Sequence, residues 1–256
     1  MKKKIAILLV CVLSLTLIFA MAGCGTDLSK EEGIKALETA TKNTKDATTF
    51  NVRTIVVKDA HNSTEYQYDV FGTDSARFTT VTNEGTNTTY DHKYFGKSLK
   101  SDVKAKKATE ADWKDCIFQD AKKFKISNKN EIVKWKVTEA NFEDFANIDI
   151  VKQNNLEVVA HKAERVLEEM NAGKLTADYC KTIGRVTTIK FNNIGKELGD
   201  ELGISAAKDG KSYPLLIEIT NEKISKFIDN SESPKTKHLI SYQGPKVVVP
   251  NWDNAY

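Results

Sequence analysis

Four cysteines and four histidines are the residues of this 256-residue chain best suited to covalent or metal chemistry. The histidines have no second His or Cys at the spacing of a zinc site. Acidic residues are abundant, but the sequence nominates no pair of them as acid and base, and no Gly-x-Ser-x-Gly or Ser-x-x-Lys motif stands in a context suited to nucleophilic catalysis. We therefore expect no metal site, no cofactor and no enzymatic activity from the histidines, which are His61, His92, His161 and His238.

Cys24 is the cysteine best placed for covalent chemistry, because it ends a targeting segment. Three lysines precede an apolar run from Ile5 to Met21, as in a secretory signal. The run Met21-Ala22-Gly23-Cys24 then resembles the lipobox of bacterial lipoproteins, although that family more often has Leu where Met21 stands. The resemblance implies cleavage between Gly23 and Cys24 and a lipid on the Cys24 thiol. The alternative is a membrane-anchoring helix with an incidental cysteine, for which the run is barely long enough.

Removal of residues 1–23 changes the charge of the protein. It takes three of the 38 basic residues and none of the 35 acidic ones, so the mature chain is formally neutral. A neutral body without a long basic run has no electrostatic footprint for nucleic acid or for anionic lipid head groups. We therefore expect attachment to the outer face of a bacterial cell membrane through the lipid on Cys24, with any protein partners unknown.

Two cysteines remain in the mature chain. Cys116 and Cys180 both lie among apolar residues at helical spacing, which predicts helices over residues 109–124 and Ala177–Ile183. An extracytoplasmic location permits a disulfide between them. Two buried, unpaired thiols are the other interpretation.

The order of the predicted elements indicates an α+β protein. Residues 24–28 are expected to form a lipidated tether and 29–256 a single extracytoplasmic domain. Ser29 and Glu32 form a capping-box pattern at the start of one helix, and a seven-position apolar stripe marks a second helix at Leu156–Met170. Period-two segments before and after the helical middle third predict two groups of antiparallel strands.

Aromatic residues alternate along two of these strands. Tyr66 and Tyr68 share one face of a strand, and Tyr90, His92 and Tyr94 share one face of another. Such faces either pack under the helices or line a cavity for an apolar ligand.

The lipobox, the capped helix, the strand meander and the closing segment Leu239–Pro250 together resemble the LolA-like superfamily of bacterial lipoproteins and lipoprotein carriers. The resemblance covers residues 29–95 and 213–250. It implies a curved antiparallel half-barrel with helices on its concave face and a cavity that carries lipids or acyl chains. From the alternation along the strands, we expect Tyr66, Tyr68, Tyr90 and Tyr94 to contribute to such a cavity. The expected function is binding or carrying a hydrophobic ligand. The alternative is a non-catalytic cell-envelope interaction module with a fully packed core.

Overall fold

The computed structural model describes residues 25–99, 110, 113–126, 130–232, 235–243 and 247. The predicted signal peptide and Cys24 lie outside the described residues. No helix within the described ranges is long and apolar enough to cross a membrane.

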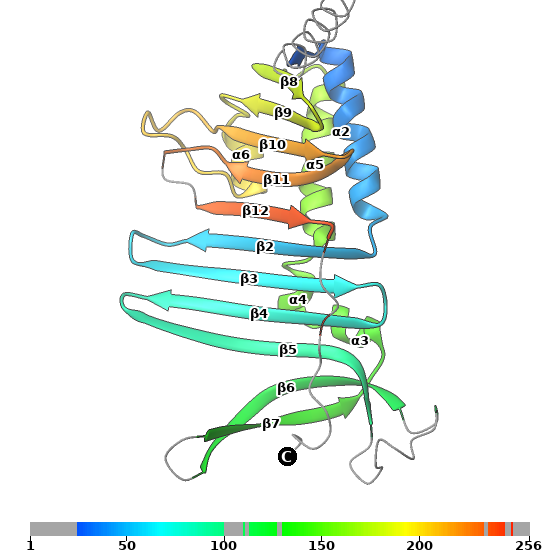
Figure 1. The fold of residues 1–256 in the computed structure, drawn as a ribbon. Coiled ribbons are helices and arrows are strands. Elements are labelled where there is room, and N and C mark those ends of the chain that lie inside the picture. Colours follow the sequence, from blue (N-terminus) through cyan, green and yellow to red (C-terminus); the bar gives the residue numbers. More distant parts are fainter. Residues whose placement is uncertain are drawn as a thin grey trace, which may run out of the picture.

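The architecture is one open sheet of 12 strands, in which every neighbouring pair is antiparallel (Figure 1). The strands follow the order β1-β8-β9-β10-β11-β12-β2-β3-β4-β5-β6-β7, so the sheet does not close on itself. Their bounds are β1 Thr26–Asp27, β2 Thr49–Val57, β3 Asn62–Phe71, β4 Ser75–Glu84, β5 Asn87–Leu99, β6 Trp113–Ile126, β7 Asn130–Glu139, β8 Tyr179–Ile183, β9 Val186–Phe191, β10 Leu215–Thr220, β11 Lys223–Asp229 and β12 Thr236–Ser241.

The two long helices lie side by side on one face of this sheet (Figure 1). The core fills the space between them and the strands, where apolar side chains of alternating strand positions meet the helices. This arrangement confirms the predicted α+β class. The helices are α2 Lys30–Lys45, α3 Phe142–Ala146, α4 Asp149–Lys152, α5 Leu156–Asn171 and α6 Lys196–Leu202.

Helix α2 begins at the predicted capping box. The Ser29 amide donates to Glu32 Oε2 at 2.8 Å, and the Glu32 amide donates to Ser29 Oγ at 3.2 Å. These two bonds satisfy backbone donors that have no partner within the helix. The helix buries a narrow stripe, in which Leu37 and Ala40 pack on the sheet.

Helix α5 buries all seven apolar positions of its predicted stripe. Its N-cap is Asn155, whose Oδ1 accepts from the Val158 amide at 3.2 Å, and the chain leaves the helix through Gly173, at φ 71°. Helix α5 packs along α2 and shares an ion pair with it, between Lys45 and Glu164. The buried positions are Leu156, Val159, Ala160, Ala163, Val166, Leu167 and Met170.

Two predicted helices are strands in the structure. The segment at Cys116 belongs to β6, and the segment at Cys180 is β8. Gly184, which follows the second segment, has a φ of 60° and belongs to a two-residue hairpin loop in which Ile183 pairs with Val186. Pairing with neighbouring strands overrides the local helical spacing at both segments.

The expected tether is part of the folded sheet. Thr26 and Asp27 form β1, which pairs with Thr182 and Lys181 of β8, and the Leu28 amide donates to Cys180 O at 3.0 Å. The ordered body therefore begins earlier than Ser29.

Candidate ligand-binding groove

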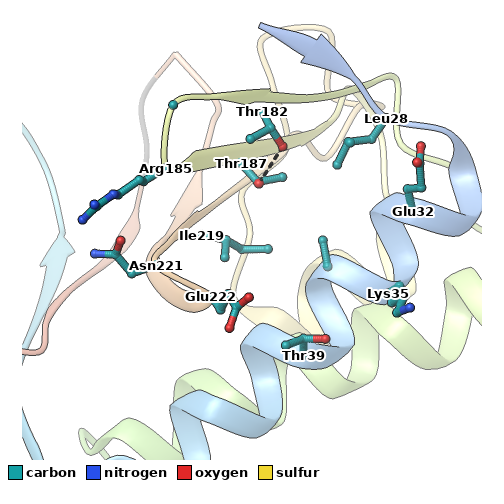
Figure 2. A pocket seen from close by; sticks show the side chains of 12 residues that line it. Leu28, Glu32, Lys35, Thr39, Thr182, Arg185, Thr187, Ile219, Asn221 and Glu222 are labelled. Carbon is teal, nitrogen blue, oxygen red and sulfur yellow. Dashed lines mark hydrogen bonds between the residues drawn. The ribbon is translucent and has the colours of Figure 1, made fainter. Parts of the chain in front are cut away.

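A groove of about 650 Å³ separates α2 from the ends of two hairpins, β8–β9 and β10–β11 (Figure 2). One wall is a flank of the helix, and the other is made of the strand ends and their connecting turns. The groove is lined by Leu28, Glu32, Lys35, Ala36, Thr39, Thr182, Gly184, Arg185, Thr187, Ile219, Asn221 and Glu222.

The groove exists because one flank of α2 carries two small side chains, Ala36 and Thr39, beside two longer ones. Glu32, Lys35, Ala36 and Thr39 follow each other at three- and four-residue spacing, which places them on the same side of the helix. Ala36 and Thr39 are half-buried, and neither is long enough to fill the space up to the hairpins. The neighbouring stripe, with Leu37 and Ala40, closes the core instead.

The floor of the groove, on the sheet, is formed by Thr182, Thr187 and Ile219. Ile219 is buried, and the Oγ1 atoms of the two threonines lie 2.9 Å apart in a hydrogen bond with each other. Because these hydroxyls are satisfied within the protein, the floor does not require a polar ligand.

The mouth of the groove is charged. Lys35 and Arg185 supply two cations, and Glu32 and Glu222 supply two anions. Within the part of the chain that the structure describes, no ion pair involves any of these four residues. Glu32 is the N3 residue of the capping box, and its hydrogen bonds with Ser29 lower the pKa of its carboxyl group.

Two hydrogen bonds fix the hairpin ends at this mouth. Asn43 Nδ2 on α2 donates to Glu222 O at 3.1 Å, and the Asn221 amide donates to Arg185 O at 3.3 Å. The groove walls are therefore held to each other and do not depend on a ligand for their spacing. An apolar floor under a charged mouth suits an amphiphile.

A second, smaller cavity of about 210 Å³ lies where α3 and α5 meet β2 and β3. Phe50, Tyr68, Val70 and Leu156 are among its lining residues. Its volume falls below the roughly 300–1,000 Å³ of typical ligand pockets, whereas the groove beside α2 falls within that range. Two further cavities, of about 320 Å³ beside β1 and about 460 Å³ beside α6, also fall within it but are smaller than the groove. The candidate site is therefore the groove.

The four tyrosines predicted to line one cavity are on opposite faces of the sheet. Tyr68 pairs with Phe78, which pairs with Lys93, so Lys93 shares the helix-covered face with Tyr68. Tyr66 is on that face too and stacks on Phe78 with 6.3 Å between ring centroids. Tyr90 and Tyr94 flank His92 on the other face, and Tyr90 is 65% exposed. The predicted alternation is present within each strand. The register between the strands, which the sequence does not reveal, places the two pairs of tyrosines on opposite faces.

Both described cysteines are free thiols. Cys116 is on β6 and Cys180 on β8, with eight strands between them, which at about 4.8 Å per strand separates them by roughly 40 Å. The disulfide is therefore not formed. The alternative of two buried, unpaired thiols holds for Cys116, whereas Cys180 is unpaired but only half-buried. Burial raises the pKa of the Cys116 thiol to about 11, so it is a poor nucleophile. Cys180 lies against α2, where a Cβ on Gly33 would stand 3.0 Å from its Sγ.

The described residues include no group of three or more His, Cys, Asp or Glu that could hold a metal ion. His238 is buried in a hydrogen-bonded chain with Thr54 and Lys162. His92 contacts Thr79, and His61 and His161 lie on the surface.

None of the groove residues was predicted from the sequence to bind a ligand. Their only signal is that Ile183-Gly184-Arg185-Val186 and Thr220-Asn221-Glu222-Lys223 are both two-residue hairpin loops, which place Arg185 and Glu222 at neighbouring sheet ends.

No protein-family model matches this chain, and no curated protein matches it. Among solved structures, LprF from Mycobacterium bovis is similar at 15% sequence identity and a TM-score of 0.35, over 88% of this chain and 99% of that one. At this TM-score the likeness assigns neither a family nor a function.

Proposed function

We propose that this protein is a lipid-anchored bacterial lipoprotein that binds or carries a hydrophobic ligand, such as an acyl chain, in the groove between α2 and the β8–β9 and β10–β11 hairpins. The observation that carries the proposal is the groove itself, with its volume of about 650 Å³ and its floor of Ile219 and mutually bonded threonines. The proposal includes no catalytic step.

The position of the groove along the chain supports this proposal. Leu28 lines the groove and stands four residues after Cys24. Four residues span at most about 14 Å, so an anchor on Cys24 holds the groove close to the bilayer surface. The predicted signal and lipobox supply the anchor, and the groove supplies a site that a membrane-derived chain reaches without crossing much water.

The alternative function, an envelope interaction module with a fully packed core, is favoured by α5. This helix buries its whole apolar stripe, and the cavity at its N-terminal end is small. The space beside α2 is what distinguishes the two proposals, since a module needs no groove there.

Binding of a fluorescent fatty acid tests the proposal. The lipoprotein is purified in detergent, and binding is compared with that of Ala36→Trp, which fills the groove from its helical wall. Glu38→Trp is the matched control, because Glu38 is exposed on the same helix outside the groove. We expect Ala36→Trp to weaken binding at least about tenfold, which corresponds to about 1.4 kcal/mol, and Glu38→Trp to leave it unchanged.

Absence of uptake by the wild-type protein, together with no copurifying lipid in native mass spectrometry, would overturn this proposal in favour of the interaction module. Circular dichroism of both tryptophan variants shows whether lost binding follows from misfolding.

A further inference from the structure

Glu222 has an unusual backbone for its residue type. Asn221 and Glu222 form the two-residue loop between β10 and β11, and both have positive φ, at 49° and 58°. Asn tolerates this left-handed conformation, but Glu seldom adopts it, because its Cβ crowds the backbone. The Asn43 Nδ2 bond to Glu222 O holds the loop in place against α2. A two-residue hairpin loop requires positive φ at both central positions, so the turn imposes this conformation on Glu222 and fixes where its side chain leaves the backbone.

The strained backbone places a carboxylate at the groove. Figure 2 shows the Glu222 side chain between Ile219 of the floor and Thr39 of α2, while Arg185 extends from the neighbouring hairpin end beside Asn221. The Asn221 amide and Arg185 O are hydrogen-bonded, so the two turns touch. Even so, the described residues contain no ion pair between Arg185 and Glu222. Charges of both signs are therefore available to a ligand at the same mouth.

We propose that the groove selects a membrane lipid whose head group carries both an ammonium and a phosphate, with the ammonium at Glu222 and the phosphate at Arg185. This inference rests on the proposed function and specifies its ligand class. A carboxylate forms charge-assisted hydrogen bonds with an ammonium group, and a guanidinium does so with a phosphate. The acyl chain lies on the apolar floor.

The anchor explains why the ligand belongs to the membrane. Leu28 is part of the groove, and the lipid on Cys24 keeps this residue within about 14 Å of the anchored backbone. A lipid of the same leaflet is thus the amphiphile at highest local concentration.

Three probes with the same acyl chain test the head-group selectivity. Lysophosphatidylethanolamine carries an ammonium and a phosphate, lysophosphatidylglycerol carries the phosphate alone, and a monoacylglycerol carries no charge. Each is added to the full-length lipoprotein in detergent, and its occupancy is measured by native mass spectrometry. The variants are Glu222→Gln and Arg185→Gln. Glu84→Gln is the matched control, because Glu84 is an exposed glutamate at the β4–β5 turn, outside the groove.

We expect the wild-type protein to favour lysophosphatidylethanolamine over lysophosphatidylglycerol about fivefold, as expected of one exposed charge pair. Glu222→Gln should abolish this preference, because it removes the partner of the ammonium and the repulsion of the lipid that carries the phosphate alone. Arg185→Gln should weaken both phospholipids about fivefold relative to the monoacylglycerol. Glu84→Gln should behave as the wild type.

Equal binding of the three probes, unchanged by Glu222→Gln, would overturn the head-group inference and leave the proposed function standing. Binding of no probe by the wild-type protein would overturn both. A preference for lysophosphatidylglycerol would also contradict the inference, because it would show that the cations alone select the ligand.

Discussion

Lys162 Nζ lies 3.2 Å from His238 Nε2, in the middle of the sheet, where β12 meets β2. Lys162 also donates to Leu202 O at 2.7 Å, and His238 Nδ1 is 2.9 Å from Thr54 Oγ1. A lysine ammonium has only donors, so Nε2 accepts, and Nδ1 carries the proton and donates to Thr54. Burial, and secondarily the charge of Lys162, lower the pKa of His238 to about 3.

This buried histidine predicts a pH-dependent stability. In the unfolded chain His238 is protonated near pH 6.5, whereas in the folded chain it is protonated only near pH 3. The contribution of His238 to the free energy of unfolding is therefore fully present above pH 6.5. It declines by about 1.4 kcal/mol per pH unit as the pH falls from 6.5 toward 3. Urea unfolding at several pH values should show a shallower decline for His238→Gln, while the exposed His161→Gln keeps the wild-type slope. Parallel slopes for wild type and His238→Gln would contradict this assignment.

Leu167→Ala should destabilise the fold. Leu167 is buried on α5 between the helix and the core, so the substitution removes apolar contacts and leaves a cavity. The expected loss in the free energy of unfolding is about 2–5 kcal/mol. Denaturant titration measures it, and the neighbouring exposed Glu168→Ala should lose less than about 1 kcal/mol. A loss for Leu167→Ala no larger than that of the control would mean that this stripe does not pack as described.

Glu222→Gly should stabilise the protein while it removes the carboxylate from the groove. Glycine adopts positive φ without steric penalty, so the left-handed strain at this turn is relieved. The expected gain is about 1 kcal/mol, seen as a higher midpoint in thermal or urea unfolding. Gly72→Ala makes the opposite change at another turn, where φ is 56° and nothing crowds an added Cβ, and should destabilise by a similar amount. No gain for Glu222→Gly would show that the turn is not strained.

Cys24→Ser should leave an uncleaved precursor in the bacterial host, because the lipid-modified thiol is what the lipobox resemblance implies for processing. The wild-type protein should partition into the detergent phase, with its mature N-terminus at Cys24. N-terminal mass spectrometry of the two proteins checks both statements. Wild-type protein in the medium with an unmodified N-terminus is the outcome that excludes an anchor.

The helices were predictable where local signals agree. Two such signals are the capping box at Ser29 and Glu32 and the apolar stripe of α5. Each depends only on residues a few turns apart in the same helix, so it can be recognised from the sequence. Strand β8 was not predictable in this way. Its five residues have helical spacing, and only pairing with β1 and β9 makes them extended.

The groove was unpredictable for a related reason. Ala36 and Thr39 are unremarkable as helix residues, and their small size matters only because two hairpins end opposite them. Strand register likewise determines which face of the sheet each tyrosine occupies, since a shift of one residue would have moved Tyr94 to the face of Tyr68.

The two-residue strand β1 would set the orientation of the sheet in a protein anchored as we propose. Only Gly25 separates Cys24 from the first paired residue, and an added Cβ there would lie 2.5 Å from the Ile183 side chain. A chain anchored at Cys24 would therefore have almost no flexible linker, and the β1 edge of the sheet would lie nearest the bilayer. At about 4.8 Å per strand, 12 strands carry the β6–β7 hairpin up to roughly 50 Å away. In that orientation the groove would lie near the bilayer, and the exposed Tyr90 would lie on the part of the sheet far from it.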